Sequence, residues 1–210
     1  ERLDMEVGPL SVEVLEPMQR LKLTCDDPDS GLACELVFEA FIPAHEEPRF
    51  IRRLGSQLMM DLTRMMQNGS WQGWIEVAGE RIEVARTNFT GTRDRSWGIR
   101  NIGAADRQPN PVAAAMQFYW IWVPMNFQDC SIHYFVNQDA DGNAWNENAV
   151  LIPKFGQGPE EVMVEREYKQ IYQSGTRYAK SASISLTRPD GRQCRIDLQP
   201  KWNFFMKGIG

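Results

Sequence analysis

The sequence lacks the residues and motifs that mark several common classes of protein. It has only two histidines and four cysteines in 210 residues. No two cysteines form a CxxC pair, so neither a zinc site nor a thioredoxin-type motif is expected. It has no apolar run of about 18 residues, so we expect no transmembrane helix. GxSxG, HExxH, P-loop and dinucleotide-binding motifs are absent as well, which removes several enzyme classes but not enzymes as such.

Positive charge is also scarce. The 23 Lys and Arg are outnumbered by 28 Asp and Glu, the net charge is −5, and there is no basic run. A nucleic-acid partner is therefore not expected. No signal peptide is visible, although the chain starts at Glu1 and a leader or preceding domain could have been removed. We expect a cytoplasmic protein with reduced cysteines, and the sequence leaves its oligomeric state open.

The sequence is rich in short alternating segments separated by turn residues. "LKLTC" and "ELVFEAFI" flank the turn "DDPDSGLA", which would place Cys25 and Cys34 opposite each other. Ala78-Gly79, Asp141-Gly142 and Asp190-Gly191 are further turn signals between alternating runs. Many short strands joined by such turns predict an all-β chain, an antiparallel barrel or a sandwich.

One segment departs from this alternation and predicts a short helix. Between residues 49 and 67 the apolar residues recur at spacings of three, four and seven, the period of one helix face. These residues are Ile51, Leu54, Leu58, Met59, Leu62, Met65 and Met66. We interpret the methionines as core-filling residues rather than as ligands.

The stretch "FYWIWV" is apolar on both of its faces. Alternation puts Trp120 and Trp122 on one face and Tyr119 and Ile121 on the other. Such a strand must be covered on both sides, either in a barrel packed on another layer or between two sheets. The aromatic face is either ordinary core packing or a wall against a lipophilic ligand.

The two histidines do not indicate a metal site. His133 lies in the next strand without a second histidine, a cysteine or a carboxylate at ligand spacing. His45 lies in the proline-rich stretch "PAHEEP" and is expected to meet solvent. We therefore expect no bound metal.

The stretch "GTRDRSWGIR", residues 91–100, concentrates charge and a tryptophan between two glycines. If it is extended, Arg93, Arg95 and Trp97 point one way and Asp94 the other. One interpretation is a structural cluster of ion pairs at a barrel mouth, since charges removed from water must be paired. The other interpretation is a functional site.

These residues carry a resemblance to a known family. "QNGSWQGWIEVAGERIEV" followed by "GTRDRSWGIR" resembles the motif pair of the carotenoid 1,2-hydratase/AttH-like, hydroxyneurosporene synthase-related proteins. Their signature is an aspartate followed three residues later by tryptophan and glycine, here Asp94, Trp97 and Gly98. "YWIWVPMNFQDCSIHYFVNQDADG" and the closing "FFMKGIG" are similar to later segments of these proteins. The resemblance spans roughly residues 12 to 210.

The resemblance implies a bacterial protein with a lipocalin-like fold of two consecutive antiparallel β-barrels. Residues 1–66 would then form the end of a first barrel plus the connecting helix, and residues 67–210 the second barrel. More sequence normally precedes and follows such a segment. Family members act on isoprenoid double bonds, and relatives of the same fold include cyclases. The expected partner is a lipophilic small molecule of isoprenoid, steroid or polyketide type, with no cofactor.

The resemblance also implies a site. Asp94 would be the catalytic acid or base and Arg95 a polar anchor in an aromatic-lined pocket. Arg95 stands where the hydratase signature has histidine, and an always-charged arginine cannot shuttle a proton. This difference argues against hydration itself. The remaining ligand-binding candidates are Trp97, Trp120, Trp122, His133, Tyr119 and Asn126.

Several mechanisms fit such a pocket. A protonated Asp94 could protonate a double bond while tryptophan faces stabilise the cation. An ionised Asp94 could act as base in an isomerisation or elimination. An arginine donor could instead polarise a carbonyl while the pocket folds a polyene for cyclisation. The alternative is a non-catalytic carrier of a hydrophobic ligand. A carbohydrate-binding sandwich is least favoured because the tryptophans lie in apolar runs.

Overall fold

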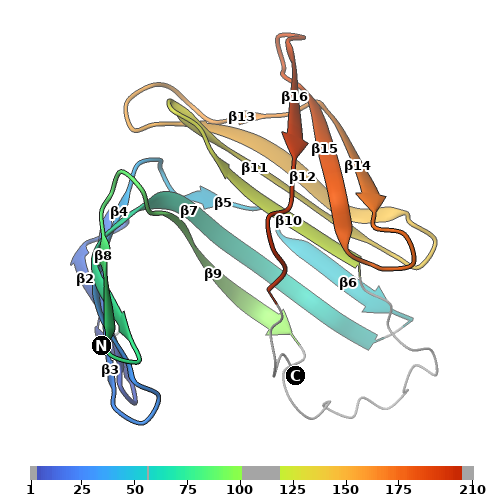
Figure 1. Cartoon of the computed structure of the whole chain (residues 1–210). Helices are drawn as coiled ribbons and strands as arrows, with labels where there is room; N and C mark the ends of the chain where they lie inside the picture. The colour runs from blue at the N-terminus through green and yellow to red at the C-terminus, as the bar shows by residue number, and fades with distance from the viewer. Residues whose placement is uncertain (1–3, 56, 101–118, 205–210) are drawn as a thin grey trace.

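A computed structural model of the chain describes residues 4–55, 57–100 and 119–204. Within these ranges every regular element is a β-strand, and all strand pairs are antiparallel (Figure 1). No helix that could span a membrane is found among the described residues. Most of the closing "FFMKGIG" lies outside them.

The first sheet is organised around one long strand. β7 pairs with β4, β5 and β6 along one edge and with β8 and β9 along the other. β1, β2 and β3 continue the sheet beyond β4. The strands of this sheet are β1 (Asp4–Val7), β2 (Leu10–Glu16), β3 (Arg20–Asp27), β4 (Leu32–Ala40), β5 (His45–Glu46), β6 (Phe50–Leu54), β7 (Gln57–Val77), β8 (Glu80–Val84) and β9 (Thr90–Arg100).

A second sheet forms the middle layer of the molecule. Its inner strand β11 has seven consecutive buried residues. One face packs on the third sheet through a core that includes Tyr134 and Ile184, and the other packs on Met66 of β7 through Val150. The second sheet contains β10 (Tyr119–Asn126), β11 (Cys130–Gln138), β12 (Ala144–Pro153) and β13 (Glu161–Val162), and the third contains β14 (Glu165–Tyr172), β15 (Ala179–Thr187) and β16 (Gln193–Leu198).

This arrangement explains the two apolar faces of "FYWIWV". β10 lies between two other sheets, so both of its faces are covered. Trp122 faces the first sheet, whereas Ile121 on the neighbouring position packs against the core shared with the third sheet. The sequence left two arrangements open, a barrel packed on another layer and a strand between two sheets. The second is confirmed.

The predicted helix over residues 49–67 is wrong. These residues form β6, a turn and the first half of β7. Gly55 in the turn has φ of 57°, which breaks any helix there. Both faces of β7 carry apolar side chains here, Leu62 and Met66 on one and Met65 on the other. Apolar residues on both faces of a strand produced the spacings that imitate a helix.

The hairpins are confirmed. Ala78 and Gly79 both have positive φ, 52° and 83°, as a tight turn between β7 and β8 requires. The Asp-Gly turns at residues 141–142 and 190–191 join β11 to β12 and β15 to β16. Cys25 and Cys34 face each other directly across β3 and β4, and both are free thiols.

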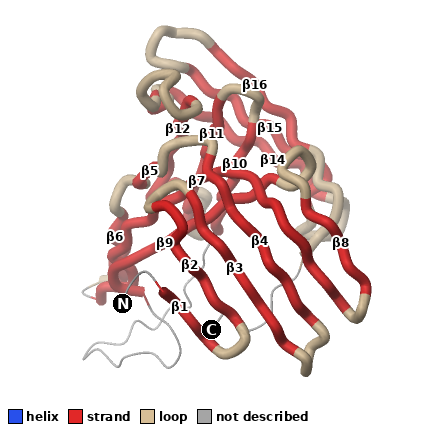
Figure 2. The backbone as a smooth tube through the Cα atoms, turned by 90° about the vertical axis from the view of Figure 1, so that its left-hand side faces the viewer, coloured by secondary structure: helices blue, strands red, loops and turns tan. Residues whose placement is uncertain are grey.

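The first sheet curls where aromatic rings lie on glycines. A Cβ on Gly69 would be 2.3 Å from the carbonyl oxygen of Glu39 and 2.6 Å from the Phe38 ring. A Cβ on Gly91 would be 2.0 Å from Nε1 of Trp71. Beyond this point the limb formed by β2, β3, β4 and β8 turns away from the direction of β9 (Figures 1 and 2). The result is a half-barrel. β7 runs unbroken across residues 66 and 67, the predicted boundary between two barrels, and the division of the chain into two barrels stays a prediction.

Substituting Gly69 tests the close packing at the curl. Gly69→Ala should lower the free energy of unfolding by about 2–3 kcal/mol, since the backbone oxygen it meets cannot move cheaply. Gly175→Ala is the matched control. Its Cβ meets nothing within 4 Å, and only its φ of 71° is strained, at a cost of about 1 kcal/mol. Urea unfolding measures both, and equal losses would show that the curl does not depend on this contact.

Candidate functional site

A carboxylate is buried between the first and the second sheet. Glu47 follows β5 directly, and its side chain is 1% exposed. Its backbone N–H donates to the carbonyl oxygen of Arg64 at 2.8 Å, so pairing along β7 sets its position. Nε1 of Trp122 on β10 donates to its Oε1 at 3.1 Å. Its Oε2 lies 3.7 Å from the guanidinium of Arg64.

A buried histidine completes this cluster. His133 of β11 is 1% exposed, and its ring meets Trp122 edge to face with 5.1 Å between centroids. Its Nδ1 lies 3.7 Å from Oε1 of Glu47, beyond hydrogen-bond distance. Within the described residues neither ring nitrogen of His133 nor Oε2 of Glu47 has a hydrogen-bond partner. Buried polar atoms of this kind are unusual and are often associated with function.

Burial controls the protonation of both groups. It raises the pKa of Glu47, and the nearby charge of Asp94 raises it further, while Arg64 and the Trp122 hydrogen bond oppose the shift. Burial, together with His45 and Arg64, lowers the pKa of His133 to about 3. His133 is therefore neutral near pH 7, and its approach to Glu47 is not an ion pair.

The cluster extends to the surface through two side chains. The Arg64 guanidinium lies 5.1 Å from the ring centroid of Trp120 and 5.8 Å from that of Trp122, both favourable cation–π distances. Trp120 is 42% exposed. Asp94 on β9 is exposed on the same face of the first sheet, opposite Met66. The site thus contains one carboxyl at the surface and one in the interior.

The second histidine is also buried, so the expectation that it meets solvent is wrong. His45 is 4% exposed and pairs with Met66 of β7. Its Nδ1 lies 2.8 Å from Oε2 of Glu160, in the segment before β13. That segment covers the proline-rich stretch, which the sequence alone does not show.

Asn126 belongs to a polar network beside the cluster. Its Oδ1 accepts hydrogen bonds from Nδ2 of Asn68 at 2.6 Å and from Oγ of Ser131 at 3.1 Å. Oγ1 of Thr92 donates to Oδ1 of Asn68 at 2.7 Å. These bonds join β7, β9, β10 and β11 around one small polar core.

The predicted site residues divide among three places. Asp94, Trp120, Trp122, His133 and Asn126 all lie where the first and second sheets meet. Arg95 and Trp97 lie on the opposite face of β9, as alternation predicted. Tyr119 lies on the far side of the second sheet. Neither Asp94 nor its neighbour at 95 forms an ion pair with a described residue, which does not support the structural ion-pair interpretation.

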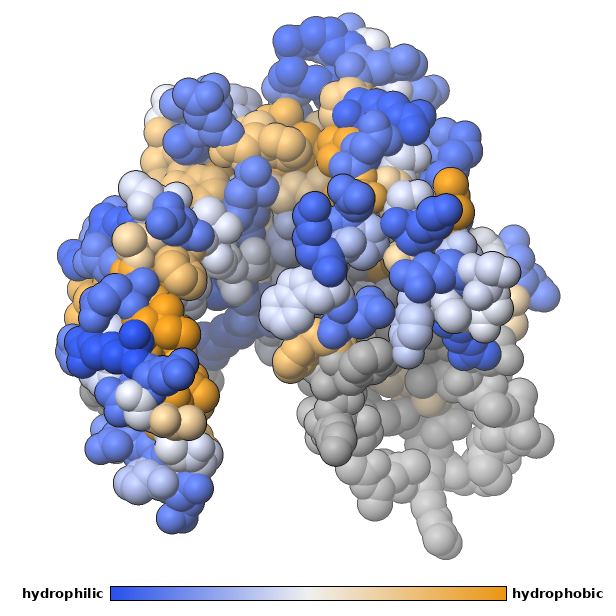
Figure 3. Space-filling view, viewed as in Figure 1, coloured by the Kyte–Doolittle hydropathy of each residue, from blue (hydrophilic) through white to orange (hydrophobic). Residues whose placement is uncertain are grey.

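The face that carries Arg95 and Trp97 continues along the inside of the curl as an apolar surface. Figure 3 shows apolar side chains on the limb beside the hollow. Several are exposed, Trp97 to 47% and Ile82 to 47%. The opposite face of the same strands carries Lys22, Glu35 and Glu76. The inner face contains Val12, Leu21, Leu23, Leu36, Phe38, Trp71, Ile75, Val77, Ile82 and Val84.

A polar contact separates this apolar surface from Arg95. Nε of Arg93 donates to Oε1 of Gln67 at 2.8 Å. The Gln67 amide donates in turn to the carbonyl oxygens of Met18 and Ile42. Burial lowers the pKa of Arg93. This contact fixes the orientation of β9 relative to β7.

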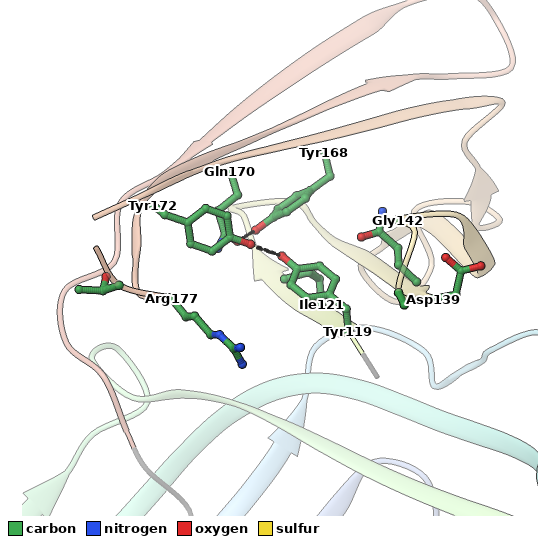
Figure 4. Close-up of a pocket in the computed structure, with 11 residues that line it drawn as sticks. Tyr119, Ile121, Asp139, Gly142, Tyr168, Gln170, Tyr172 and Arg177 are labelled. Atoms are coloured by element: carbon green, nitrogen blue, oxygen red, sulfur yellow. Dashed lines mark hydrogen bonds between the residues drawn. The ribbon is translucent and has the colours of Figure 1, made fainter. Parts of the chain in front are cut away.

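A cavity of about 1020 Å³ lies at the ends of the second and third sheets (Figure 4). Tyr119, Tyr168 and Tyr172 line it together with Gln170 and Arg177. The hydroxyls of Tyr119 and Tyr172 are 3.2 Å apart. This cavity is separate from the Glu47 cluster, because the second sheet lies between them.

Sequence reasoning missed three members of the cluster. Glu47 and His45 lie in a stretch that looks like a surface loop, and nothing in it signals burial. Arg64 did give a signal, since it is the one positive charge in the methionine-rich "MMDLTRMM" and alternates with Leu62 and Met66. A charge at such a position requires a partner, here the buried carboxylate.

The cluster does not have the composition of a metal site. Among the described residues no group of three or more His, Cys, Asp and Glu side chains is placed to hold a metal ion.

Comparison with known proteins gives a family and a fold. The chain belongs to the family described as "Family of unknown function (DUF8625)", whose model matches residues 1–210. No curated protein matches it. It is similar to the crystal structure of a candidate AttH from Nitrosomonas europaea, with a TM-score of 0.52 and 14% identity, over 94% of this chain and 70% of that one. This likeness shows an all-β, lipocalin-like fold.

The depressed pKa of His133 predicts acid sensitivity. The folded state binds a proton at His133 more weakly than the unfolded chain does, so acid favours unfolding. The free energy of unfolding keeps the full contribution of neutral His133 above pH 6.5 and loses it as pH falls toward 3. By pH 4.5 the loss should be about 2–3 kcal/mol. His133→Phe keeps the ring and removes the titration, so its unfolding free energy should change less between pH 7 and 4.5. Parallel curves for both proteins in urea unfolding would contradict this assignment.

Proposed function

We propose that this member of a family with a lipocalin-like fold binds a lipophilic small molecule on the inner face of its curled sheet. The observation that carries the proposal is the apolar surface that lines the curl, with Arg95 and Trp97 at its end. Soluble proteins rarely expose a continuous apolar surface of this kind unless it binds something. A concave apolar wall with a few polar groups is typical of small-molecule sites.

Arg95 supports a ligand with a polar end. Its guanidinium is exposed on the same face as the apolar residues. A carboxylate, hydroxyl or carbonyl on the ligand would accept hydrogen bonds from it, while Trp97 contacts the adjoining apolar part. Molecules of isoprenoid, steroid or polyketide type combine these two features.

Asp94 supports a catalytic role at the same end of the ligand. The outer edge of β9 is not paired with any described strand. A ligand whose polar end lies over this edge would meet Arg95 on one face and Asp94 on the other. Asp94 would act as acid or base in an isomerisation or cyclisation. Behind it, Glu47 is a second carboxyl whose raised pKa keeps it protonated over a wider pH range.

The second candidate function is that of a carrier without catalysis. The apolar inner face and Arg95 are sufficient for binding, and they do not require Asp94. The observation that favours catalysis is the buried carboxyl of Glu47, whose Oε2 has no hydrogen bond among the described residues and whose pKa the charge of Asp94 helps to raise. A carrier has no use for a group of this kind.

Charge on the inner face should abolish ligand binding. The probe is cis-parinaric acid, a fluorescent polyene with a carboxylate. Leu23→Asp places a charge among the apolar residues of β3, and the Kd should rise at least about tenfold because that charge must be desolvated. Fluorescence titration measures the Kd, and a thermal melt verifies that the variant is folded.

The neighbouring position is the matched control. Thr24 lies on the outer face of the same strand, so Thr24→Asp should leave the Kd unchanged. Arg95→Met should weaken binding of the acid but not of its methyl ester. Equal effects of the substitutions at 23 and 24 would disprove binding on the inner face.

Catalysis by Asp94 should transfer solvent protons to the ligand. Native mass spectrometry of the purified protein identifies any co-purifying lipophilic molecule. Incubated with the protein in D₂O, this molecule should gain deuterium, because an acid–base residue exchanges its proton with solvent. Asp94→Asn should abolish the gain and leave binding intact. Equal deuterium in both proteins would exclude Asp94, and none in either would favour the carrier.

A further inference from the structure

We infer that the cavity between the second and third sheets is a separate binding site for a flat aromatic carboxylate. This inference does not depend on the proposed function, because the second sheet separates the two places. The cavity measures about 1020 Å³ and is partly open to solvent. It therefore has the size of a site for one small molecule with room for water.

The aromatic walls of the cavity come from two strands. β14 contributes Tyr168, Gln170 and Tyr172, which alternate onto the face that looks toward the second sheet. β10 contributes Tyr119 and Ile121 from the opposite side. Figure 4 shows the tyrosine rings converging across the cavity. Aromatic rings on two sides favour a flat ligand that stacks against them.

The phenols in the cavity form one hydrogen-bonded group. The hydroxyl of Tyr168 donates to Oε1 of Gln170. The hydroxyl of Tyr119 lies 3.5 Å from the same oxygen and 3.2 Å from the hydroxyl of Tyr172. Burial raises the pKa of both Tyr119 and Tyr168. The phenols therefore remain protonated, and most of their protons are used within the group. When Tyr119 donates to Tyr172, the hydroxyl proton of Tyr172 is left for an acceptor oxygen of a ligand.

Arg177 and Asp139 give the lining one charge of each sign, so hydrogen-bonding capacity rather than net charge favours a carboxylate. Arg177, in the turn after β14, is exposed and lines the cavity. The lining contains one carboxylate, that of Asp139. It accepts hydrogen bonds from the backbone N–H groups of Asp141 and Asn143 within its own turn. This leaves the Arg177 guanidinium, with at most the hydroxyl proton of Tyr172, available to a ligand. Arginine binds carboxylates through paired N–H bonds.

The test uses naphthoate and its neutral analogue naphthylmethanol as probes, with the full chain in isothermal titration calorimetry. Naphthoate should bind saturably with a sub-millimolar Kd, and naphthylmethanol about tenfold more weakly because it lacks the charge. Arg177→Met should raise the Kd for naphthoate about tenfold and leave that for naphthylmethanol unchanged. Tyr172→Phe removes the one phenol donor that the group leaves free and should weaken naphthoate binding by a smaller factor.

Two control variants separate this site from the rest of the molecule. Lys169→Met removes a cation from the outer face of β14 and should not change the Kd for naphthoate. Leu23→Asp should not change it either, since that residue belongs to the inner face of the curl. The inference is overturned if naphthoate shows no saturable binding, if Arg177→Met binds it as tightly as the native protein, or if Leu23→Asp abolishes its binding.

Discussion

The contact of the Phe38 and Trp71 rings with bare glycine backbone is the constraint on which the rest of the structure depends. Because Gly69 and Gly91 lack side chains, the rings lie on the backbone itself and the sheet curls around them. Because of the curl, the two halves of β7 lie in different parts of the molecule. Its first half lies against the second sheet, and its second half carries the limb whose inner face is apolar.

The same strand explains why two different chemical environments lie so close together. Even-numbered residues of β7 between 62 and 68 face the second sheet and meet the buried carboxylate. Odd-numbered residues face the inside of the curl. β9 repeats this division, so neighbouring residues in "TRDRSW" belong to different environments. The buried carboxyl and the apolar inner face are thereby separated by the thickness of one sheet, and they meet only at its edge.

Local sequence signals predicted the strands well because alternation and turn chemistry are local properties. The Asp-Gly and Ala-Gly turns, the facing cysteines and the two apolar faces of β10 all follow from residues close in the chain. The helix prediction failed because this part of β7 carries apolar residues on both faces, such as Met65 and Met66, so no clean alternation reveals the strand. The site was recovered only in part. Trp122 and His133 lie on strand faces that alternation assigns, whereas Glu47 is buried by contacts with Arg64 of β7 and Trp122 of β10, which are distant in sequence.

The position of β11 in the middle layer limits how the Glu47 cluster can open. Its backbone is paired on both edges and its side chains are covered on both faces. Amide protons in such a strand exchange with solvent only when the whole domain unfolds. His133 therefore forms a rigid wall that no local fluctuation removes. Any transient access to the buried carboxyl has to come from the opposite side, where β5 has only two residues and Trp120 is partly exposed.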